Sequence, residues 1–286
     1  MAIDYDRLMA LDIPEVEQSY SFRDTCLYGL GLGLGLDPMN RDHLRFVYEE
    51  NLRALPTMAV VLARPGFWFR EMDTGIDWVA IVHGEQSTTF HAPLPVEGRV
   101  RGKTRVTGIV DKGEGRGALV ISERDVTDCD TGRLLATVEQ TTFCRNDGGF
   151  GGPAGAKQRA APLPERAPDA RITLPTSSQA ALIYRLTGDL NPLHADPEVA
   201  AKAGFDRPIL HGLATYGVAG YAVLHALCDL DPSRLRSLSA RFTAPVMPGE
   251  TLVTEVWKQD GAPQFRVLSQ QSGRTVLSNG HAEVTS

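Results

Sequence analysis

A carboxylate, an amide and an imidazole lie within six positions of the segment TGDLNPLHADPEVAA, where they could carry out acid–base chemistry. They belong to Asp189, Asn191 and His194. An ionised carboxylate and a neutral imidazole can take a proton from one reacting group and return it to another. The proline after Asn191 forces a turn at that point. The spacing therefore predicts that Asp189 and His194 converge on one point of a constrained loop.

The same residues allow two other interpretations. Short polar side chains often hydrogen-bond the backbone of their own loop, so Asp189 and Asn191 could simply cap the next turn, with His194 as a packing or surface histidine. Alternatively, His194, Asp196 and His211 could ligate a metal. No H-E-x-x-H motif, facial-triad spacing or cysteine cluster accompanies them, so we predict no metal site.

The segments around this loop predict an antiparallel sheet wrapped around one long helix. Before the loop, Thr176 and Gln179 stand at capping-box spacing ahead of an apolar run, and Gly188 is suited to end that helix. After the loop, HGLATYGVAGYAVLHAL has apolar residues at helical spacing. Four short β-rich segments separated by glycine or proline turns follow. This is the hot-dog arrangement, and the predicted fold class is α+β.

The sequence also predicts two copies of this fold. The pattern F-x-A-P recurs at Phe90 and Phe242, and a Gly-Arg pair followed by a strand-like run recurs further along in both halves. Between the halves lies a segment dense in Gly, Pro and Ala, which is typical of a linker. We therefore expect a first repeat over residues 1–145, a linker over 146–171 and a second repeat over 172–286.

The first repeat is expected to lack the long helix of the second. Where that helix would fall, the chain reads LRALPTMAVVLARPGFWF, in which Pro56 and Pro65 bound only about two turns. Since proline breaks helix interiors, the helix of the first repeat should be short or missing.

Charge and composition argue against several kinds of partner. The chain has 286 residues, a net charge of −6 and a pI near 5.7, whereas a nucleic-acid surface needs a basic stripe. No segment approaches the ~20 apolar residues of a membrane span, and the acidic N-terminus lacks signal-peptide features. The alternating glycines of residues 28–38 do not fit the dinucleotide motif, which leaves close backbone packing as the simpler role. Four scattered cysteines favour reduced thiols and a cytoplasmic protein.

The segments YRLTGDLNPLHAD and FDRPILHGLATYG resemble those of the R-specific enoyl-CoA hydratases, also called hydratase 2 or MaoC-like dehydratases. LRFVYE, LPTMAVV, VHGEQ, VDKGEG and RFTAPVMPGETL extend the resemblance over most of the chain, to the two-domain hydratase 2 of peroxisomal multifunctional enzymes. The resemblance implies a double hot-dog in which only the second repeat is catalytic. It also implies reversible hydration of trans-2-enoyl-CoA to (R)-3-hydroxyacyl-CoA by a homodimer. No metal or redox cofactor is implied, because coenzyme A is part of the substrate.

The resemblance further implies roles for individual residues. Asp189 and His194 would hold one water as the acid–base pair, and Asn191 would orient it. The backbone amide of Gly212 would face the thioester oxygen at the start of the long helix. Substrate contacts are implied for the other matching residues: His83, Gly84, Lys112, Pro192, Leu193, His211 and Phe242. His83 and Phe242 could equally be ordinary strand residues, and Lys112 a solvated turn lysine.

Substrate size and two alternative functions complete the expectations. Without a long helix, the first repeat would leave a wide apolar tunnel for medium, long or bulky acyl chains. An acyl-CoA thioesterase could share the scaffold, but attack on the carbonyl gives no reason to pair Asp189 with His194. A non-catalytic acyl-CoA-binding protein would not need that pair at all.

Overall fold

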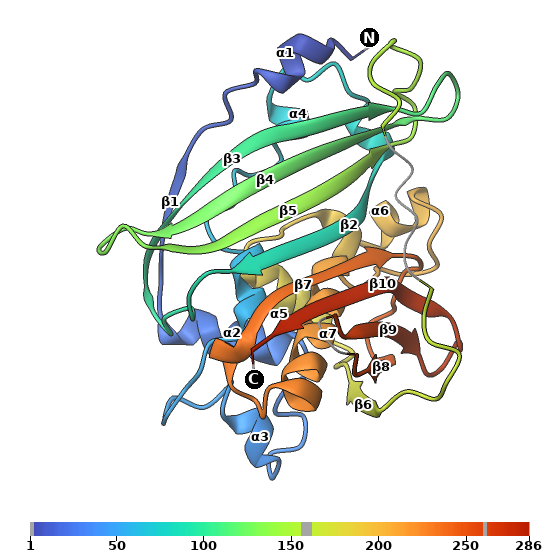
Figure 1. Cartoon of the computed structure of the whole chain (residues 1–286). Coiled ribbons are helices and arrows are strands. Elements are labelled where there is room, and N and C mark those ends of the chain that lie inside the picture. The colour runs from blue at the N-terminus through green and yellow to red at the C-terminus, as the bar shows by residue number, and fades with distance from the viewer. Residues whose placement is uncertain (1–2, 156–161, 260–261, 286) are drawn as a thin grey trace.

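The computed structural model describes residues 3–155, 162–259 and 262–285, and its strands form a ten-stranded sheet. Every pair of neighbouring strands is antiparallel, in the order β1-β3-β4-β5-β2-β7-β10-β9-β8-β6. The strands of the first half of the chain therefore lie on one side of the sheet and those of the second half on the other (Figure 1). The strands are β1 (Val16–Tyr20), β2 (Ile81–Phe90), β3 (Gly98–Asp111), β4 (Ala118–Asp128), β5 (Leu134–Cys144), β6 (Ala170–Pro175), β7 (Leu235–Phe242), β8 (Thr251–Trp257), β9 (Gln264–Ser269) and β10 (Thr275–Val284).

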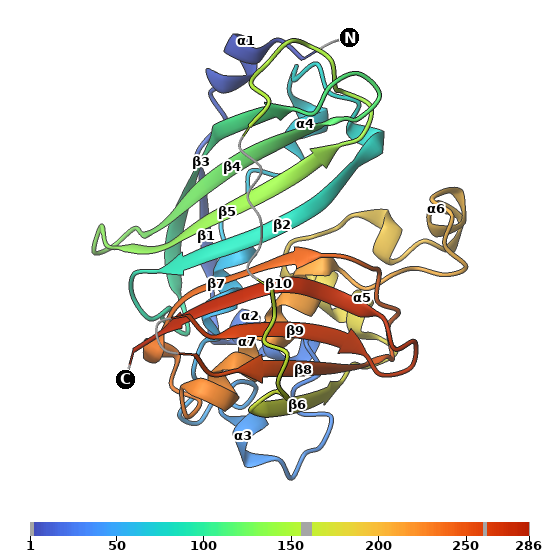
Figure 2. The same cartoon turned by 45° about the vertical axis from the view of Figure 1, so that its right-hand side comes forward.

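The two halves of the sheet join where β2 pairs with β7 (Figure 2). The register of this pair runs from Glu85 opposite Arg241 to Thr89 opposite Ser237. Arg241 Nε also donates a hydrogen bond to Glu85 Oε1 over 2.7 Å. This register brings the end of β2 that carries His83 beside the end of β7.

Most helices are short, and α7 is the longest of those that the structure describes. The α-helices are α1 (Tyr5–Met9), α2 (Phe22–Gly31), α3 (Arg41–Leu44), α4 (Trp68–Glu71), α5 (Ala180–Tyr184), α6 (Pro197–Lys202) and α7 (Gly212–Leu227). The 3-10 turns are η1 (Pro56–Val60), η2 (Trp78–Ala80), η3 (Arg185–Thr187), η4 (Pro192–His194) and η5 (Pro232–Arg234).

Helix α7 is the buried central helix that the sequence predicts. It contacts β6, β7, β8 and β10 of the sheet and the turn η1. Small residues allow this close approach: a Cβ atom at Gly217 would lie 2.7 Å from Leu32 Cδ2, and one at Gly220 would lie 2.4 Å from Thr57 Cγ2. Tyr216 anchors the helix to the sheet by donating a hydrogen bond to the carbonyl oxygen of Leu238 over 2.6 Å. The long helix thus belongs to the second half of an α+β fold.

In the first half, the corresponding position is occupied by η1, a single buried turn from Pro56 to Val60. Pro56 is its first residue, and Pro65 follows five residues after its end. The two prolines therefore predicted correctly that the first half has no long helix here. In place of a long helix, the short helices α1 and α4 and the turn η1 pack against β2 to β5.

The predicted capping box at Thr176 is wrong. Thr176 Oγ1 donates to the carbonyl oxygen of Glu250 over 2.7 Å and accepts from the amide of Gly249 over 3.0 Å, so it ties β6 to the turn before β8. Gln179 precedes α5 without a side-chain hydrogen bond to the helix. The end of the helical segment is as predicted, because η3 stops at Gly188, whose φ is +122°.

The glycine-rich stretch packs closely against other backbone. Gly33 has a φ of +98°, and a Cβ atom there would lie 2.4 Å from the carbonyl oxygen of Pro175. The expected linker is partly folded: the amides of Gly149 and Gly151 donate to the Asp111 carboxylate. Residues 156–161 of that linker lie outside the described residues, and the boundaries of the two repeats stay a prediction. None of the helices in the described ranges combines the length and apolar character that crossing a bilayer requires.

Candidate active site

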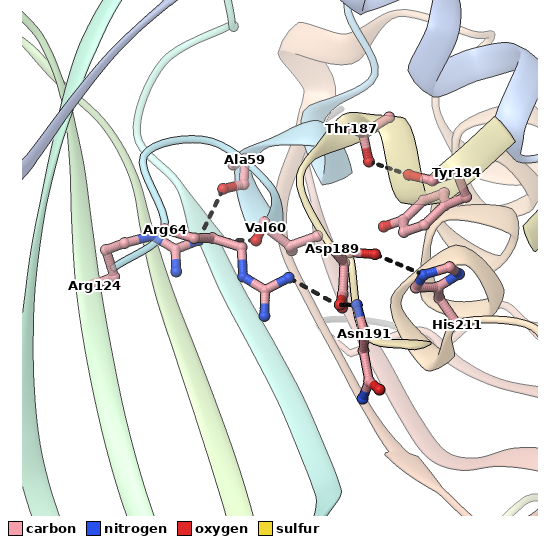
Figure 3. Close-up of polar contacts among 9 residues, drawn as sticks. All are labelled: Ala59, Val60, Arg64, Arg124, Tyr184, Thr187, Asp189, Asn191 and His211. Atoms are coloured by element: carbon pink, nitrogen blue, oxygen red, sulfur yellow. Dashed lines mark hydrogen bonds and ion pairs between the residues drawn. The ribbon is translucent and has the colours of Figure 1, made fainter. Parts of the chain in front are cut away.

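The predicted catalytic loop is held in shape by its own turn chemistry. Asn191 Oδ1 accepts a hydrogen bond from the amide of Leu193 over 3.0 Å, which caps the turn η4. Asp196 Oδ1 accepts a hydrogen bond from the amide of Glu198 over 2.8 Å and so caps α6. Separately, the described residues contain no cluster of three or more side chains that could ligate a metal. The turn-capping interpretation thus applies to Asn191, whose side chain extends away from the Asp189 carboxylate (Figure 3). It also applies in part to Asp189, because Asp189 Oδ1 accepts a hydrogen bond from the backbone amide of Asn191 over 3.4 Å.

His194 is a buried histidine with one ring nitrogen occupied. Its Nδ1 lies 2.8 Å from the carbonyl oxygen of Ile209, which can only accept, so Nδ1 carries the proton and Nε2 carries a lone pair. Burial lowers the pKa of His194 below its usual value, against the opposing effects of that hydrogen bond and of Asp189. The ring is therefore neutral near pH 7, and Nε2 can accept a proton.

Asp189 carries an ionised carboxylate, and its backbone carbonyl contacts the His211 ring that stacks on this imidazole. Burial acts to raise the pKa of its carboxyl group, but the charge of Arg64, together with His211 and His194, outweighs burial and lowers the pKa to about 2. Arg64 Nη1 donates a hydrogen bond to Asp189 Oδ2 over 3.1 Å (Figure 3). The carboxylate is therefore a hydrogen-bond acceptor at every physiological pH and a weak base while Arg64 contacts it.

His211 connects the loop to the start of α7. Its ring stacks on that of His194 with 3.7 Å between centroids, and its Nε2 lies 3.1 Å from the backbone carbonyl oxygen of Asp189 (Figure 3). Burial and the neighbouring His194 lower the pKa of His211 to about 3, so the neutral ring donates from Nε2. Its Nδ1 is buried without a hydrogen-bond partner among the described residues. His211 thus fixes the backbone of Asp189 relative to the helix.

Gly212, the first residue of α7, offers a free backbone amide at this point. The amide makes no hydrogen bond within the described residues, as is usual for the first turn of a helix. A Cβ atom at this position would lie 3.1 Å from Phe242 Cε1, so the ring of Phe242 covers the glycine closely. A helix N-terminus with an unpaired amide favours negative charge, such as that of an enolate oxygen.

The residues expected to contact coenzyme A lie at one end of the sheet. The rings of His83 and Phe242 are 4.6 Å apart, and a register irregularity at Gly84 interrupts the pairing of β2 with β5. Lys112 follows β3, and its Nζ lies 5.1 Å from the centre of the Phe143 ring, on the strand next to β2. The expected contacts of these residues, and those of Pro192 and Leu193 in η4, stay predictions.

Comparison with known proteins shows which family the chain is similar to. Residues 159–279 match the family described as MaoC like domain, and residues 18–146 match the MFE-2 hydratase 2 N-terminal domain. The chain is 43% identical to "Enoyl-CoA hydratase ChsH3" of Mycobacterium tuberculosis, over 98% of each chain. A crystal structure of a MaoC-like dehydratase from Phytophthora capsici superposes with a TM-score of 0.86 at 31% identity, over 98% of each chain.

The chain belongs to the MaoC-like dehydratases of the two-domain, hydratase 2 type. A more distant protein of Mycobacterium tuberculosis, described as having a double hotdog fold, matches at 18% identity and a TM-score of 0.54, over 99% of this chain and 96% of that one. The predicted family and the predicted α+β double hot-dog fold are therefore confirmed.

The sequence analysis did not predict two residues that lie near Asp189 in this MaoC-like dehydratase. Arg64, which pairs with Asp189, lies 125 positions away in the first half of the chain. Tyr184 has a buried hydroxyl without a partner in the described part of the chain, and its ring points toward Asp189 (Figure 3). A signal for Arg64 was present, because it is a charged residue at the end of the buried apolar run MAVVLA.

Acid is expected to destabilise this MaoC-like dehydratase through neutral histidines with a buried ring nitrogen. Burial, with the charge of Arg64, lowers the pKa of His83 to about 4, and His211 is lowered further. An unfolded histidine has a pKa of about 6.5. Because the folded pKa values are lower, this contribution to stability is complete above pH 6.5 and is lost as the pH falls toward 4. Each such histidine lowers the free energy of unfolding by about 1.4 kcal/mol per pH unit in that window.

Denaturant unfolding at pH 7 and pH 5 measures this effect. The variant His83→Gln should lose less free energy of unfolding between the two pH values than the parent does. The matched control is His91→Gln, because His91 is exposed and directly follows β2, the strand that carries His83. This variant should lose as much free energy of unfolding between pH 7 and pH 5 as the parent does. Equal losses in His83→Gln and the parent would contradict the assignment of a neutral His83 with a lowered pKa.

Proposed function

We propose that the protein adds water reversibly to trans-2-enoyl-CoA thioesters and forms (R)-3-hydroxyacyl-CoA. The proposal is supported by three observations: His194 Nε2 can accept a proton, Asp189 is ionised, and Gly212 at the start of α7 has an unpaired backbone amide. The name of the mycobacterial relative, an enoyl-CoA hydratase, supports the same reaction class.

The proposed reaction uses the three groups in sequence. Asp189 accepts a hydrogen bond from one water and orients its oxygen toward C3 of the substrate. As the C3–O bond forms, His194 Nε2 takes the proton of that water, and the C2–C3 π electrons move onto the thioester oxygen. The amide of Gly212 donates to this enolate oxygen. The proton then passes from His194 to C2, which regenerates the neutral imidazole and balances the reaction without an oxidant, a reductant or a metal.

Arg64 determines which of the two groups, Asp189 or His194, accepts the proton. Because its guanidinium keeps Asp189 ionised and weakly basic, His194 is the stronger proton acceptor. Arg64 is therefore a positioning residue that holds the carboxylate toward the water site. The (R) configuration, the coenzyme A contacts of His83, Gly84, Lys112 and Phe242, and a homodimeric state belong to the same proposal.

A panel of trans-2-enoyl-CoA substrates tests the proposed function. We expect loss of the enoyl absorbance, an (R)-3-hydroxyacyl-CoA product by chiral analysis, and turnover that persists from short to medium, long and branched chains. Release of free coenzyme A, detected with a thiol reagent, would instead indicate the thioesterase alternative. Binding without turnover of any enoyl-CoA would indicate the non-catalytic alternative.

The pH dependence of hydration should report the protonation of His194. Its pKa lies below the usual histidine value of about 6.5, and the reaction needs the neutral ring. The value of kcat/KM should therefore be flat above pH 7 and fall on the acid side with a single protonation below about pH 6.5. A rate that rises as the pH is lowered from 7 to 5 would contradict the role of His194 as the proton acceptor.

A further inference from the structure

A pocket lies between the inner face of the first half of the sheet and the chain that runs from η1 to α4. Its cavity volume is about 100 Å³, which is small for a whole ligand but sufficient for a terminal group. Its walls include apolar side chains from Phe67 to Phe69, but its sheet side is polar. The polar lining residues are Arg64, Gln86, Thr104, Ser122, Arg124 and Gln140. The lining of this pocket is therefore partly polar, and the wide apolar tunnel expected from the sequence stays a prediction.

Arg124 is the most unusual of these residues. It projects inward from β4 and is only 8% exposed. Its Nη2 donates to the carbonyl oxygens of Ala59 over 3.3 Å and Val60 over 2.9 Å (Figure 3). Nε is buried without a partner, and Nη1 makes no hydrogen bond to any residue in the described ranges. Two of the three guanidinium nitrogens are therefore unused.

No carboxylate neutralises this buried cation. Arg124 forms no ion pair among the described residues, and no Asp or Glu lines the pocket. Burial, with the nearby charge of Arg64, lowers the pKa of Arg124 to about 9, which still leaves it protonated at neutral pH. Buried charges are normally paired, because an isolated ion loses its hydration without compensation. The pocket also holds a second unsatisfied group, since Thr104 Oγ1 is buried without a hydrogen-bond partner in the described residues.

The pocket begins one side chain away from the candidate active site. Arg64 contributes to its wall, and the same guanidinium contacts Asp189 Oδ2. The space exists because η1 is a single turn where α7 fills the equivalent position in the second half. Arg64 therefore lies between the pocket and Asp189, and an acyl chain with its C3 near Asp189 has to pass Arg64 to reach Arg124.

We propose that this pocket receives the far end of the acyl chain, and that Arg124 binds a carboxylate there, so that the preferred substrates are enoyl-CoA thioesters with a terminal carboxylate. The inference rests on the proposed hydratase function and narrows its substrate class. A carboxylate supplies the missing counter-charge, and its two oxygens can accept from an arginine and from a neighbouring hydroxyl such as that of Thr104.

Matched substrate pairs test this inference. For a series of chain lengths, kcat/KM is measured for trans-2-enoyl-CoA ending in a methyl group and for the same chain ending in a carboxylate. At the length that reaches Arg124, the carboxylate-ended substrate should be preferred by about 10- to 100-fold, as expected for a charge-assisted hydrogen bond. The inference would be overturned if, at every chain length, kcat/KM for the carboxylate-ended substrate were equal to or lower than that for the methyl-ended substrate. An equal preference for hydroxyl-ended chains would overturn the assignment of an anion.

The variants Arg124→Met and Arg124→Lys locate the preference. The ratio of kcat/KM for the carboxylate-ended substrate to that for the methyl-ended substrate should fall to about one in Arg124→Met. In Arg124→Lys, this ratio should lie between that of Arg124→Met and that of the parent. The control is Arg105→Met, which removes an arginine from the outer face of the same sheet, where Arg105 pairs with Glu123 and Asp125. Its ratio should equal that of the parent. An unchanged ratio in Arg124→Met would contradict the role of Arg124.

Binding of saturated analogues to the parent protein separates this inference from the proposed function. If Arg124→Met does not fold, the inference can be tested on the parent protein by calorimetry with saturated carboxylate-ended and methyl-ended acyl-CoA. The carboxylate-ended analogue should bind more tightly. Hydration of both substrate types at equal kcat/KM, with equal affinities for the analogues, would refute only the terminal carboxylate. Absence of any hydration would refute the proposed function, while the affinity ratio would still report on Arg124.

Discussion

The variant His194→Ala is expected to hydrate enoyl-CoA about 10²- to 10⁴-fold more slowly than the parent, the range typical of a lost general acid–base group. The reason is specific to one atom. His194 Nδ1 is engaged by the carbonyl oxygen of Ile209, so Nε2 is the lone pair that the site offers to the attacking water. The loss should appear in kcat, measured as the rate at which the enoyl absorbance disappears at saturating substrate.

A control separates this effect from a general loss of histidine or of stability. His91→Ala removes an exposed histidine and should keep the parent's kcat. Thermal unfolding of His194→Ala should show a folded protein, although the hydrogen bond to Ile209 is lost. A folded His194→Ala variant with the kcat of the parent would show that another group takes the proton.

The variant Asp189→Asn is expected to lower kcat by a similar factor of about 10² to 10⁴. An amide keeps the size of the side chain, but it loses the negative charge and presents a donor where the water needs an acceptor. Arg64 also loses its ionic partner. In addition, the pKa of His194 should fall further, because Asp189 is one of the groups that raise it. The acid limb of the pH profile should therefore move to lower pH in this variant.

The matched control is Asp196→Asn, a change of the same kind in the same loop. Asp196 caps α6, and asparagine is as good a cap, so this variant should retain both the fold and the parent's kcat. Equal activity losses in Asp189→Asn and Asp196→Asn would indicate that the loop is sensitive to any change of charge. In that case, Asp189 would have no special role.

The parts of the site that local chemistry dictates could be predicted from the sequence. The proline after Asn191 and the capping side chains of Asn191 and Asp196 shape the loop through contacts two or three residues apart. Apolar periodicity in α7 likewise depends on neighbouring residues, whereas the place of Gly212 at the start of the helix was implied by the family resemblance. For the same reason, the short first-half turn η1 followed directly from two prolines.

The parts that depend on long-range contacts could not be predicted in this way. Thr176 has the right spacing for a capping box, but the turn at Gly249 and Glu250, more than 70 positions away, takes its hydroxyl group. Arg64 meets Asp189 only because the two halves share one sheet. Arg124 stands in the alternating strand segment SERDVTD, where only the register decides that the arginine, and not its charged neighbours, faces inward.

The kcat of the double variant Asp189→Asn/His194→Ala, compared with the two single variants, tests the central claim most directly. If the carboxylate and the imidazole act as a unit on one water, removing the second group after the first should change kcat by less than about threefold, because groups that act as a unit are strongly non-additive. If the loss of kcat in the double variant equals the product of the losses in the two single variants, the two groups act independently. That result would contradict the shared water.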